Sequence, residues 1–180
     1  EPIWNNTAIA RVDIKLLEKI DIGSRGAYYD AAGALRDVGQ NHLLQMLALI
    51  AMDHPGEIRA DRIRKARAAV IKRLHPITFM NVRHSVVRAQ YAGYTGEQDV
   101  ARGSQTETYF RLKTQINSSR WRGVPFYLES GKALSVRKTE IIVHFKTVKP
   151  CFCSSVHGTH EHQNKITFKV QPSEGIAIRF

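Results

Sequence analysis

One histidine of this chain occupies a position where a helical pattern calls for an apolar core residue. Residues 28–45 read as a single helix, and four apolar residues lie four or seven positions from His42. They are Leu35, Val38, Met46 and Leu49. This spacing places them with His42 on one helical face. An imidazole among apolar side chains must be hydrogen-bonded, ligating or catalytic. A hydrogen-bonded core histidine is the commonest of these three roles, so other residues of the chain are needed to distinguish them.

A cluster of cations follows a glycine further along the chain. Lys132, Arg137 and Lys138 fall within seven residues, directly after Gly131. Lysine and arginine bind phosphate through charge, and arginine adds a bidentate fork. Glycine allows close backbone approach. A phosphate-binding segment is one interpretation, and a solvated basic hairpin is the other.

Polar residues that could hold a sugar are scattered, and each has a simple alternative explanation. Asp37 lies five residues before His42, which on an α-helix is a rotation of about 140°. Asp37 is therefore poorly placed to orient the His42 imidazole. Without other information, Asp37 is an exposed helix residue, Glu18 a charge at a strand end, and Gln171 a solvent-facing amide.

Potential zinc ligands crowd into one loop. They are Cys151, Cys153, His157, His160 and His162. Thiolate and imidazole suit zinc, but Cys-x-Cys is not a usual structural zinc spacing. We predict a solvated loop and no metal site.

Bulk composition favours one folded domain. The chain has 180 residues, of which 43% are hydrophobic, enough for a core. No apolar run approaches the roughly 18 residues of a membrane span, so no membrane partner is expected. Two cysteines one residue apart offer no disulfide framework, which favours a cytoplasmic location.

The formal net charge of +11 raises nucleic-acid binding as an alternative function. Much of the excess lies in residues 59–73, where an apolar stripe accompanies the cations. The stripe comprises Ile58, Ile63, Ala66, Val70 and Leu74. No aromatic residues interleave with the cations, so a solvated helix face is favoured and no nucleic-acid partner is predicted.

The remaining pattern predicts an α+β fold. A helix that Asp30 caps runs to Met52, and a basic helix follows to about Leu74. Alternating residues predict strands at 11–16, 85–91, 107–116, 124–128, 139–146, 165–171 and 175–180. We expect a largely antiparallel sheet with helices packed on one face. The strand pattern that continues to Phe180 suggests a domain incomplete at its C-terminus. No Gly-x-Gly-x-x-Gly fingerprint occurs, so an N-terminal Rossmann domain is absent from this chain.

Four motifs together resemble the glucose-6-phosphate dehydrogenase family, in the family's order. They are Gln40-Asn41-His42-Leu43-Leu44-Gln45, Trp121-Arg122-Gly123-Val124-Pro125-Phe126-Tyr127-Leu128, Gly131-Lys132-Ala133-Leu134 and Gln171-Pro172-Ser173-Glu174-Gly175. The resemblance implies the family's C-terminal substrate-binding domain. It implies a catalytic base at His42 and substrate contacts from Glu18, Asp37, Lys132, Arg137 and Gln171.

The resemblance also implies a reaction. Glucose 6-phosphate would be oxidised to 6-phosphoglucono-1,5-lactone while NADP is reduced, in a homodimer or tetramer. NADP would bind mainly to the missing N-terminal domain, and the family's main phosphate clamp would lie upstream as well. The fragment alone would then be inactive. Lys138 and Lys169 match family positions that, in some members, touch a second NADP, a site we do not predict here. An inactive homologue is a further alternative.

Overall fold

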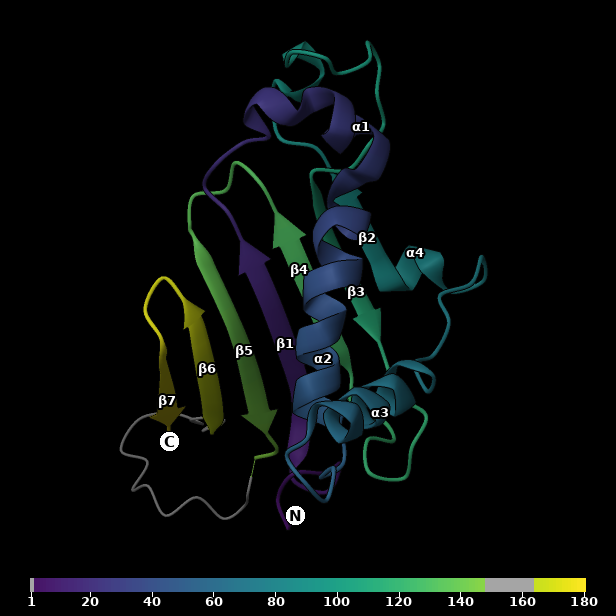
Figure 1. Cartoon of the computed structure of the whole chain (residues 1–180), viewed down its shortest axis with the longest axis vertical. Helices are drawn as coiled ribbons and strands as arrows, with labels where there is room; N and C mark the ends of the chain where they lie inside the picture. Colours follow the sequence, from purple (N-terminus) through teal and green to yellow (C-terminus); the bar gives the residue numbers. More distant parts are fainter. Residues whose placement is uncertain (1, 148–163) are drawn as a thin grey trace, which may run out of the picture.

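A computed structural model describes residues 2–147 and 164–180 of the chain (Figure 1). Its centre is a seven-stranded sheet with the order β2-β3-β4-β1-β5-β6-β7. The strands are β1 (Ile9–Leu17), β2 (Val86–Ala89), β3 (Tyr109–Thr114), β4 (Phe126–Gly131), β5 (Lys138–Phe145), β6 (Lys165–Gln171) and β7 (Gly175–Arg179). Neighbouring strands are antiparallel except β1 and β4, which pair in parallel. The sheet is therefore largely antiparallel, as the sequence predicts.

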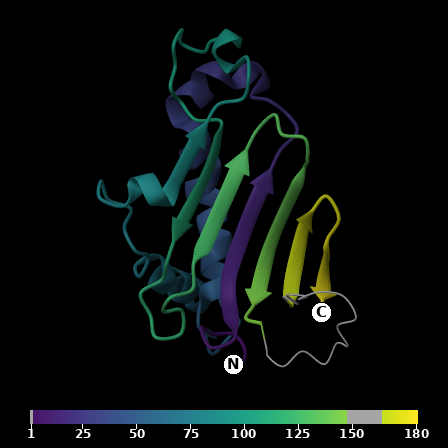
Figure 2. The same cartoon turned by 180° about the vertical axis from the view of Figure 1, so that it is seen from behind.

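The helices lie on one face of this sheet. They are α1 (Gly26–Ala34), a π-helical segment η2 (Leu35–Leu43), α2 (Leu44–Ala51), α3 (Ala60–Ile71) and the short α4 (Val82–Ser85). Two single turns of 3-10 helix, η1 (Gly23–Arg25) and η3 (Tyr94–Gly96), complete the described elements. Figure 2 shows the opposite face of the sheet without helical cover. This arrangement confirms the predicted α+β class.

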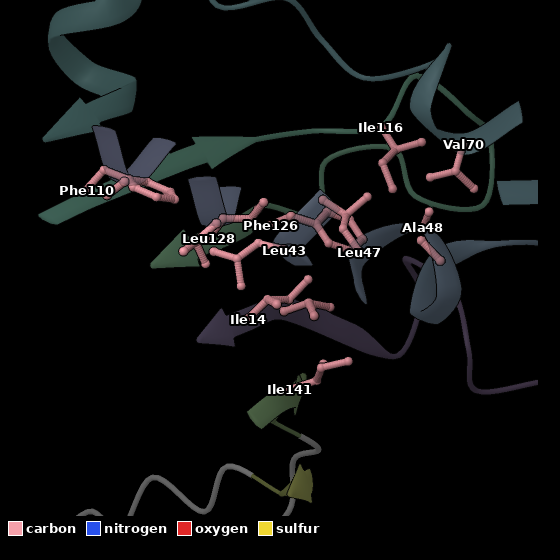
Figure 3. Close-up of a cluster of buried hydrophobic side chains, with 14 of the residues drawn as sticks. Ile14, Leu43, Leu47, Ala48, Val70, Phe110, Ile116, Phe126, Leu128 and Ile141 are labelled. Carbon is pink, nitrogen blue, oxygen red and sulfur yellow. The ribbon is translucent and has the colours of Figure 1, made fainter. Parts of the chain in front are cut away.

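The core fills the space between the sheet and the η2–α2 helix (Figure 3). Val12 and Ile14 of β1 are fully buried, as their alternation with charged residues predicts. Leu43 and Leu47 meet them from the helix side and are also fully buried. Burial of each such side chain contributes about 1.5–3 kcal/mol to folding. The core therefore fixes η2 firmly against the sheet.

The long helix predicted from Asp30 to Met52 is interrupted. It begins at Gly26, and at Gly33 the backbone leaves helical geometry with a φ of 73°. Glu107 enters at this break: its carboxylate accepts a hydrogen bond from the Leu35 backbone N–H at 3.0 Å. A Cβ at Gly33 would lie 2.6 Å from that carboxylate. Glycine is needed here because the left-handed φ and the close approach coincide.

Asp30 is not the helix N-cap that the sequence predicts, because it lies inside α1. Its carboxylate instead accepts hydrogen bonds from the Tyr94 hydroxyl at 2.9 Å, the Ala101 backbone N–H at 3.2 Å and the Ser104 hydroxyl. The hydrogen bond from Ser104 is the main cause that lowers the pKa of Asp30 below its usual value. Asp30 thus fastens the loop before β3 onto α1.

The basic stretch forms α3, which buries Val70 and leaves most of its cations in solvent. Ile58, predicted as part of the apolar stripe, is 88% exposed because it precedes the helix. The Arg67 guanidinium donates to the Gln45 side chain of the neighbouring helix. Most of this face is therefore a solvated helix surface, as expected.

The loop from Cys151 to His162 lies outside the described residues. Within residues 2–147 and 164–180, histidine, cysteine and carboxylate side chains form no group that could hold a metal ion. Over the same residues, no helix combines the length and apolar character that crossing a membrane requires.

Candidate functional site

A cleft of about 390 Å³ opens where several strand ends meet the η2 segment. It is lined by Leu16, Leu17, Glu18, Lys19, Ile20, Arg25, Asp37, Val38, His42, Lys132, Arg137, Thr139 and Gln171. All six residues predicted to act on substrate are among them, although they are spread over more than 150 positions of sequence. The structure therefore brings the whole predicted set into one cavity.

Parallel pairing of β1 with β4 creates the centre of this cleft. Leu17 lies opposite Gly131, so Glu18 and Lys132 leave their strands side by side. Two backbone hydrogen bonds from the 131–134 turn to the segment after β1 reinforce this: the Ala133 N–H donates to the Ile20 carbonyl at 2.9 Å, and the Leu134 N–H donates to the Glu18 carbonyl at 2.9 Å. The turn that carries Lys132 is thus tied to the strand end that carries Glu18.

Gly131 permits a close approach of the turn to β3. A Cβ on this residue would lie 2.7 Å from the ring of Tyr109. Any larger residue would push the turn away from β3, and Lys132 would move with it. The glycine is therefore needed for the placement of the cation.

Lys132 and Glu18 form an ion pair at the floor of the cleft. The Lys132 Nζ lies 2.8 Å from a Glu18 carboxylate oxygen. The lysine side chain is 3% exposed and the glutamate side chain 26% exposed. A cation so deeply buried needs its counter-charge, because desolvation without pairing is expensive. Glu18 is therefore more than a charge at a strand end.

His42 lines the cleft, but the reason given by the sequence pattern is wrong. His42 is exposed, and Leu35 and Leu49 of the proposed apolar stripe are 37% and 50% exposed. Of the other stripe residues Val38 is buried and Met46 is half-buried, and Leu43 and Leu47 complete the buried face. The wider π-helical turn rotates the following residues relative to an α-helix, so the imidazole faces the cleft and not the core.

Asp37 is expected to be poorly placed to orient the His42 imidazole, and its hydrogen bond does go to another residue, although both residues line one cleft. In η2 the Leu44 N–H bonds to the Gly39 carbonyl, five residues earlier. Residues five apart therefore lie nearly above one another, and Asp37 and His42 line the same cleft. The Asp37 carboxylate accepts a hydrogen bond from the Tyr28 hydroxyl at 3.2 Å. Among the described side chains, then, Asp37 is held by Tyr28 and not by the imidazole.

The far wall of the cleft comes from β5 and β6. Arg137 directly precedes β5, and Gln171 ends β6 opposite Thr139. Both Arg137 and Gln171 are exposed at the cleft. Lys138, the third cation of the cluster, pairs instead with Glu140 at 2.9 Å and does not line the cleft. Only two of the three neighbouring cations therefore face the cavity.

Sequence reasoning missed two cations of this cleft, Lys19 and Arg25. Lys19 follows Glu18 at the end of β1, and Arg25 directly precedes α1, so each adjoins a residue or motif already of interest. With them, the cleft has four lysine or arginine side chains and two carboxylates. The lining therefore carries net positive charge, which favours an anionic ligand.

A sheet covered on one face, with a basic cleft at its strand ends, describes an α+β domain whose cleft suits an anionic ligand. The structure of glucose-6-phosphate 1-dehydrogenase from Mycobacterium avium superimposes with a TM-score of 0.89 at 37% identity, over 99% of this chain and 39% of that one. A structure of glucose-6-phosphate dehydrogenase in complex with its substrate glucose-6-phosphate superimposes with a TM-score of 0.83 at 30% identity, over 97% of this chain and 36% of that one.

Sequence comparison specifies the family. The family model described as glucose-6-phosphate dehydrogenase, C-terminal domain, matches residues 1–180. The glucose-6-phosphate 1-dehydrogenases of Aggregatibacter actinomycetemcomitans and Mycolicibacterium smegmatis are 42% and 39% identical, over 100% and 99% of this chain. The chain belongs to the glucose-6-phosphate dehydrogenase family. It spans 38% of the length of each of these two relatives.

Proposed function

We propose that this chain forms the substrate-binding domain of a glucose-6-phosphate 1-dehydrogenase. The reaction would oxidise D-glucose 6-phosphate to 6-phosphoglucono-1,5-lactone and reduce NADP to NADPH. One observation carries the proposal: Glu18, Asp37, His42, Lys132, Arg137 and Gln171 line a single cleft. Membership of the family supports the substrate, since the relatives are named for it.

In this proposal His42 is the general base. Oxidation at C1 of the sugar removes a hydride from carbon and a proton from the C1 hydroxyl. Histidine suits the proton transfer because its ordinary pKa of about 6.5 lies near neutral pH. His42 is exposed at the cleft and would accept the proton on an imidazole nitrogen.

Binding and orientation of the sugar phosphate fall to the other lining residues. The ammonium of Lys132 and the guanidinium of Arg137 would contact the phosphate, by charge and by bidentate hydrogen bonds. The carboxylates of Glu18 and Asp37 and the Gln171 amide would hydrogen-bond the sugar hydroxyls. The net positive lining of the cleft agrees with a dianionic ligand.

The coenzyme is assigned to another part of the full-length protein. NADP supplies the hydride acceptor when bound, but this sequence lacks the glycine-rich turn that holds a dinucleotide. We therefore assign no coenzyme contact to residues of this chain. In the proposed architecture a Rossmann domain precedes it, and the 180 residues alone turn over no substrate.

Assembly and location complete the proposal. The face of the sheet without helices (Figure 2) carries polar pairs: Asp13 and His144 are hydrogen-bonded at 2.8 Å, and Lys15 and Glu129 form an ion pair at 3.4 Å. We assign this face to contacts within a homodimer or tetramer, in the cytoplasm.

Turnover of a full-length dehydrogenase that carries this domain tests the role of His42. Replacement by His42→Ala should lower kcat by about 100-fold or more, the usual size of a general-base contribution. His84→Ala, which removes an exposed histidine that does not line the cleft, should leave kcat unchanged. Unchanged turnover in His42→Ala would remove the central assignment.

Substrate discrimination tests the phosphate contacts. Replacement of Lys132 and Arg137 by alanine should reduce kcat/KM for glucose 6-phosphate far more than for glucose. Replacement of the exposed α3 residues Arg64 and Lys65 is the matched control for lost positive charge, and should affect neither substrate. Equal losses for both substrates would deny Lys132 and Arg137 a phosphate role. An enzyme that binds glucose 6-phosphate but never forms NADPH would favour the inactive homologue.

A further inference from the structure

Tyr29 of α1 lies beneath the candidate phosphate site, although neither the motifs nor the cleft lining includes it. The side chain is fully buried. Its ring centroid lies 5.8 Å from the Lys132 Nζ, which sits over the ring. The ring also forms a T-shaped pair with Tyr94, with centroids 6.4 Å apart. Tyr29 thus contacts both a core aromatic residue and the buried cation of the cleft.

The Lys132 ammonium has two attractive neighbours of different kinds. Glu18 offers a full negative charge at 2.8 Å, and the ring of Tyr29 offers the negative face of its π-system. Glu18 is also a proposed sugar contact, so its carboxylate would be shared between Lys132 and the substrate. The ring cannot rearrange, because it is packed on Tyr94. It is therefore the constant part of the ammonium's environment.

We propose that the ring of Tyr29 is a platform that holds the Lys132 ammonium in place for the phosphate of the substrate. Tyr29 is a positioning residue in this scheme, since it acts through Lys132 and touches no reacting atom. This inference rests on the proposed function. Without the ring, the four-carbon stem of Lys132 would settle into the vacated volume and draw the ammonium away from the cleft.

The hydroxyl group of Tyr29 has no part in this task. Within the part of the chain that the structure describes, the buried Tyr29 oxygen has no hydrogen-bond partner. Burial raises the pKa of this hydroxyl, and the negative charges of Asp37 and Glu18 raise it further, so the group stays neutral. The ring and the hydroxyl can therefore be separated by substitution: Tyr29→Phe keeps the platform, and Tyr29→Leu removes it.

The experiment compares kcat/KM for glucose 6-phosphate with kcat/KM for glucose in a full-length dehydrogenase. Tyr29→Leu should lower the ratio of kcat/KM for glucose 6-phosphate to kcat/KM for glucose by about 5- to 30-fold, the range expected for a lost cation–π contact at a desolvated site. Tyr29→Phe should keep the ratio within about twofold of the parent. If Tyr29→Leu does not accumulate as folded protein, Tyr29→Met removes the ring with an unbranched side chain that fits an irregular space better.

Phe126→Leu is the matched control, because it removes an equally buried ring that packs on Trp121 at the opposite end of β4 from Lys132. It should lower thermal stability and leave the substrate ratio unchanged. An equal fall of the ratio in Phe126→Leu and Tyr29→Leu would mean that general loosening of the core is the cause. A fall in Tyr29→Phe as large as that in Tyr29→Leu would transfer the role to the hydroxyl. Either result would overturn the inference.

Lys132→Met separates failure of this inference from failure of the proposed function. If Lys132→Met lowers the ratio and Tyr29→Leu does not, Lys132 contacts phosphate without help from the ring, and only the inference fails. If Lys132→Met itself leaves the ratio unchanged, the assignment of Lys132 to phosphate fails with it.

Discussion

The ion pair between Lys132 and Glu18 makes an asymmetric prediction about stability. The lysine side chain is 3% exposed and the glutamate side chain is 26% exposed. If Glu18 is replaced by leucine, the ammonium remains buried without a counter-charge. If Lys132 is replaced by methionine, the remaining carboxylate can turn toward water. The first change should therefore destabilise the fold more than the second, although both break the same contact.

The magnitudes follow from this difference in burial. Loss of one partner of a buried pair costs about 3–5 kcal/mol when the other charge stays buried. We expect about 3 kcal/mol for Glu18→Leu, the lower end, because the pair adjoins the open cleft. For Lys132→Met we expect about 1 kcal/mol, as for a pair whose remaining charge is hydrated. The double variant should resemble Lys132→Met, since no unpaired cation remains.

Urea and thermal unfolding of the 180-residue chain measure these differences, with the fluorescence of Trp4 and the buried Trp121 as the signal. For a chain of this size, a loss of about 3 kcal/mol lowers Tm by about 6–12 °C. Asp61→Ala, which removes the exposed partner of Arg59 on α3, is the control and should change stability by less than about 1 kcal/mol. Equal losses for Glu18→Leu and Lys132→Met, or a larger loss for Lys132→Met, would refute the reasoning.

Two further predictions concern the elements that hold the cleft. Gly39→Ala places a Cβ 2.8 Å from the ring of buried Phe110, so the free energy of unfolding should fall by about 1–3 kcal/mol. Gly96→Ala is the control in the same urea unfolding experiments, because open space surrounds its Cβ. Equal losses of stability in Gly39→Ala and Gly96→Ala would contradict the packing argument. The hydrogen bond from Ser104 is the chief cause that lowers the pKa of Asp30 in the folded state. The ionised Asp30 carboxylate therefore stabilises the fold fully above the unfolded-state pKa of about 3.9, and this stabilisation is lost as the pH falls below that value. Between pH 7 and pH 2 the free energy of unfolding should therefore fall less steeply for Asp30→Asn than for the parent chain. An unchanged pH profile would be evidence against a stabilising role of the Asp30 hydrogen bonds.

Local patterns predict much of this fold because a strand that buries one face shows alternating apolar and polar residues in its own sequence. Val12 and Ile14 alternate with charged residues, and β1 forms where that pattern lies. The strand at 165–171 coincides with β6. The resemblance to a family then added Glu18, Asp37 and Gln171, which their own surroundings in sequence would have left as ordinary surface groups.

Features that depend on contacts between distant segments were not predictable from the pattern. The apolar spacing around His42 fits an α-helix, whereas the π-helical turn depends on Glu107 at the Gly33 break and on the approach of Gly39 to Phe110. Parallel pairing of β1 with β4, which brings Glu18 beside Lys132, joins residues more than 100 positions apart. Such pairings are decided by tertiary packing, so local periodicity carries no sign of them.

A crystal structure of a full-length dehydrogenase carrying this domain, with glucose 6-phosphate bound, tests the central claim most directly. The account predicts the sugar in the cleft, its C1 hydroxyl within about 3 Å of an imidazole nitrogen of His42, and its phosphate against Lys132 or Arg137. Sugar density outside this cleft, or a bound sugar with its C1 hydroxyl far from His42, would contradict it.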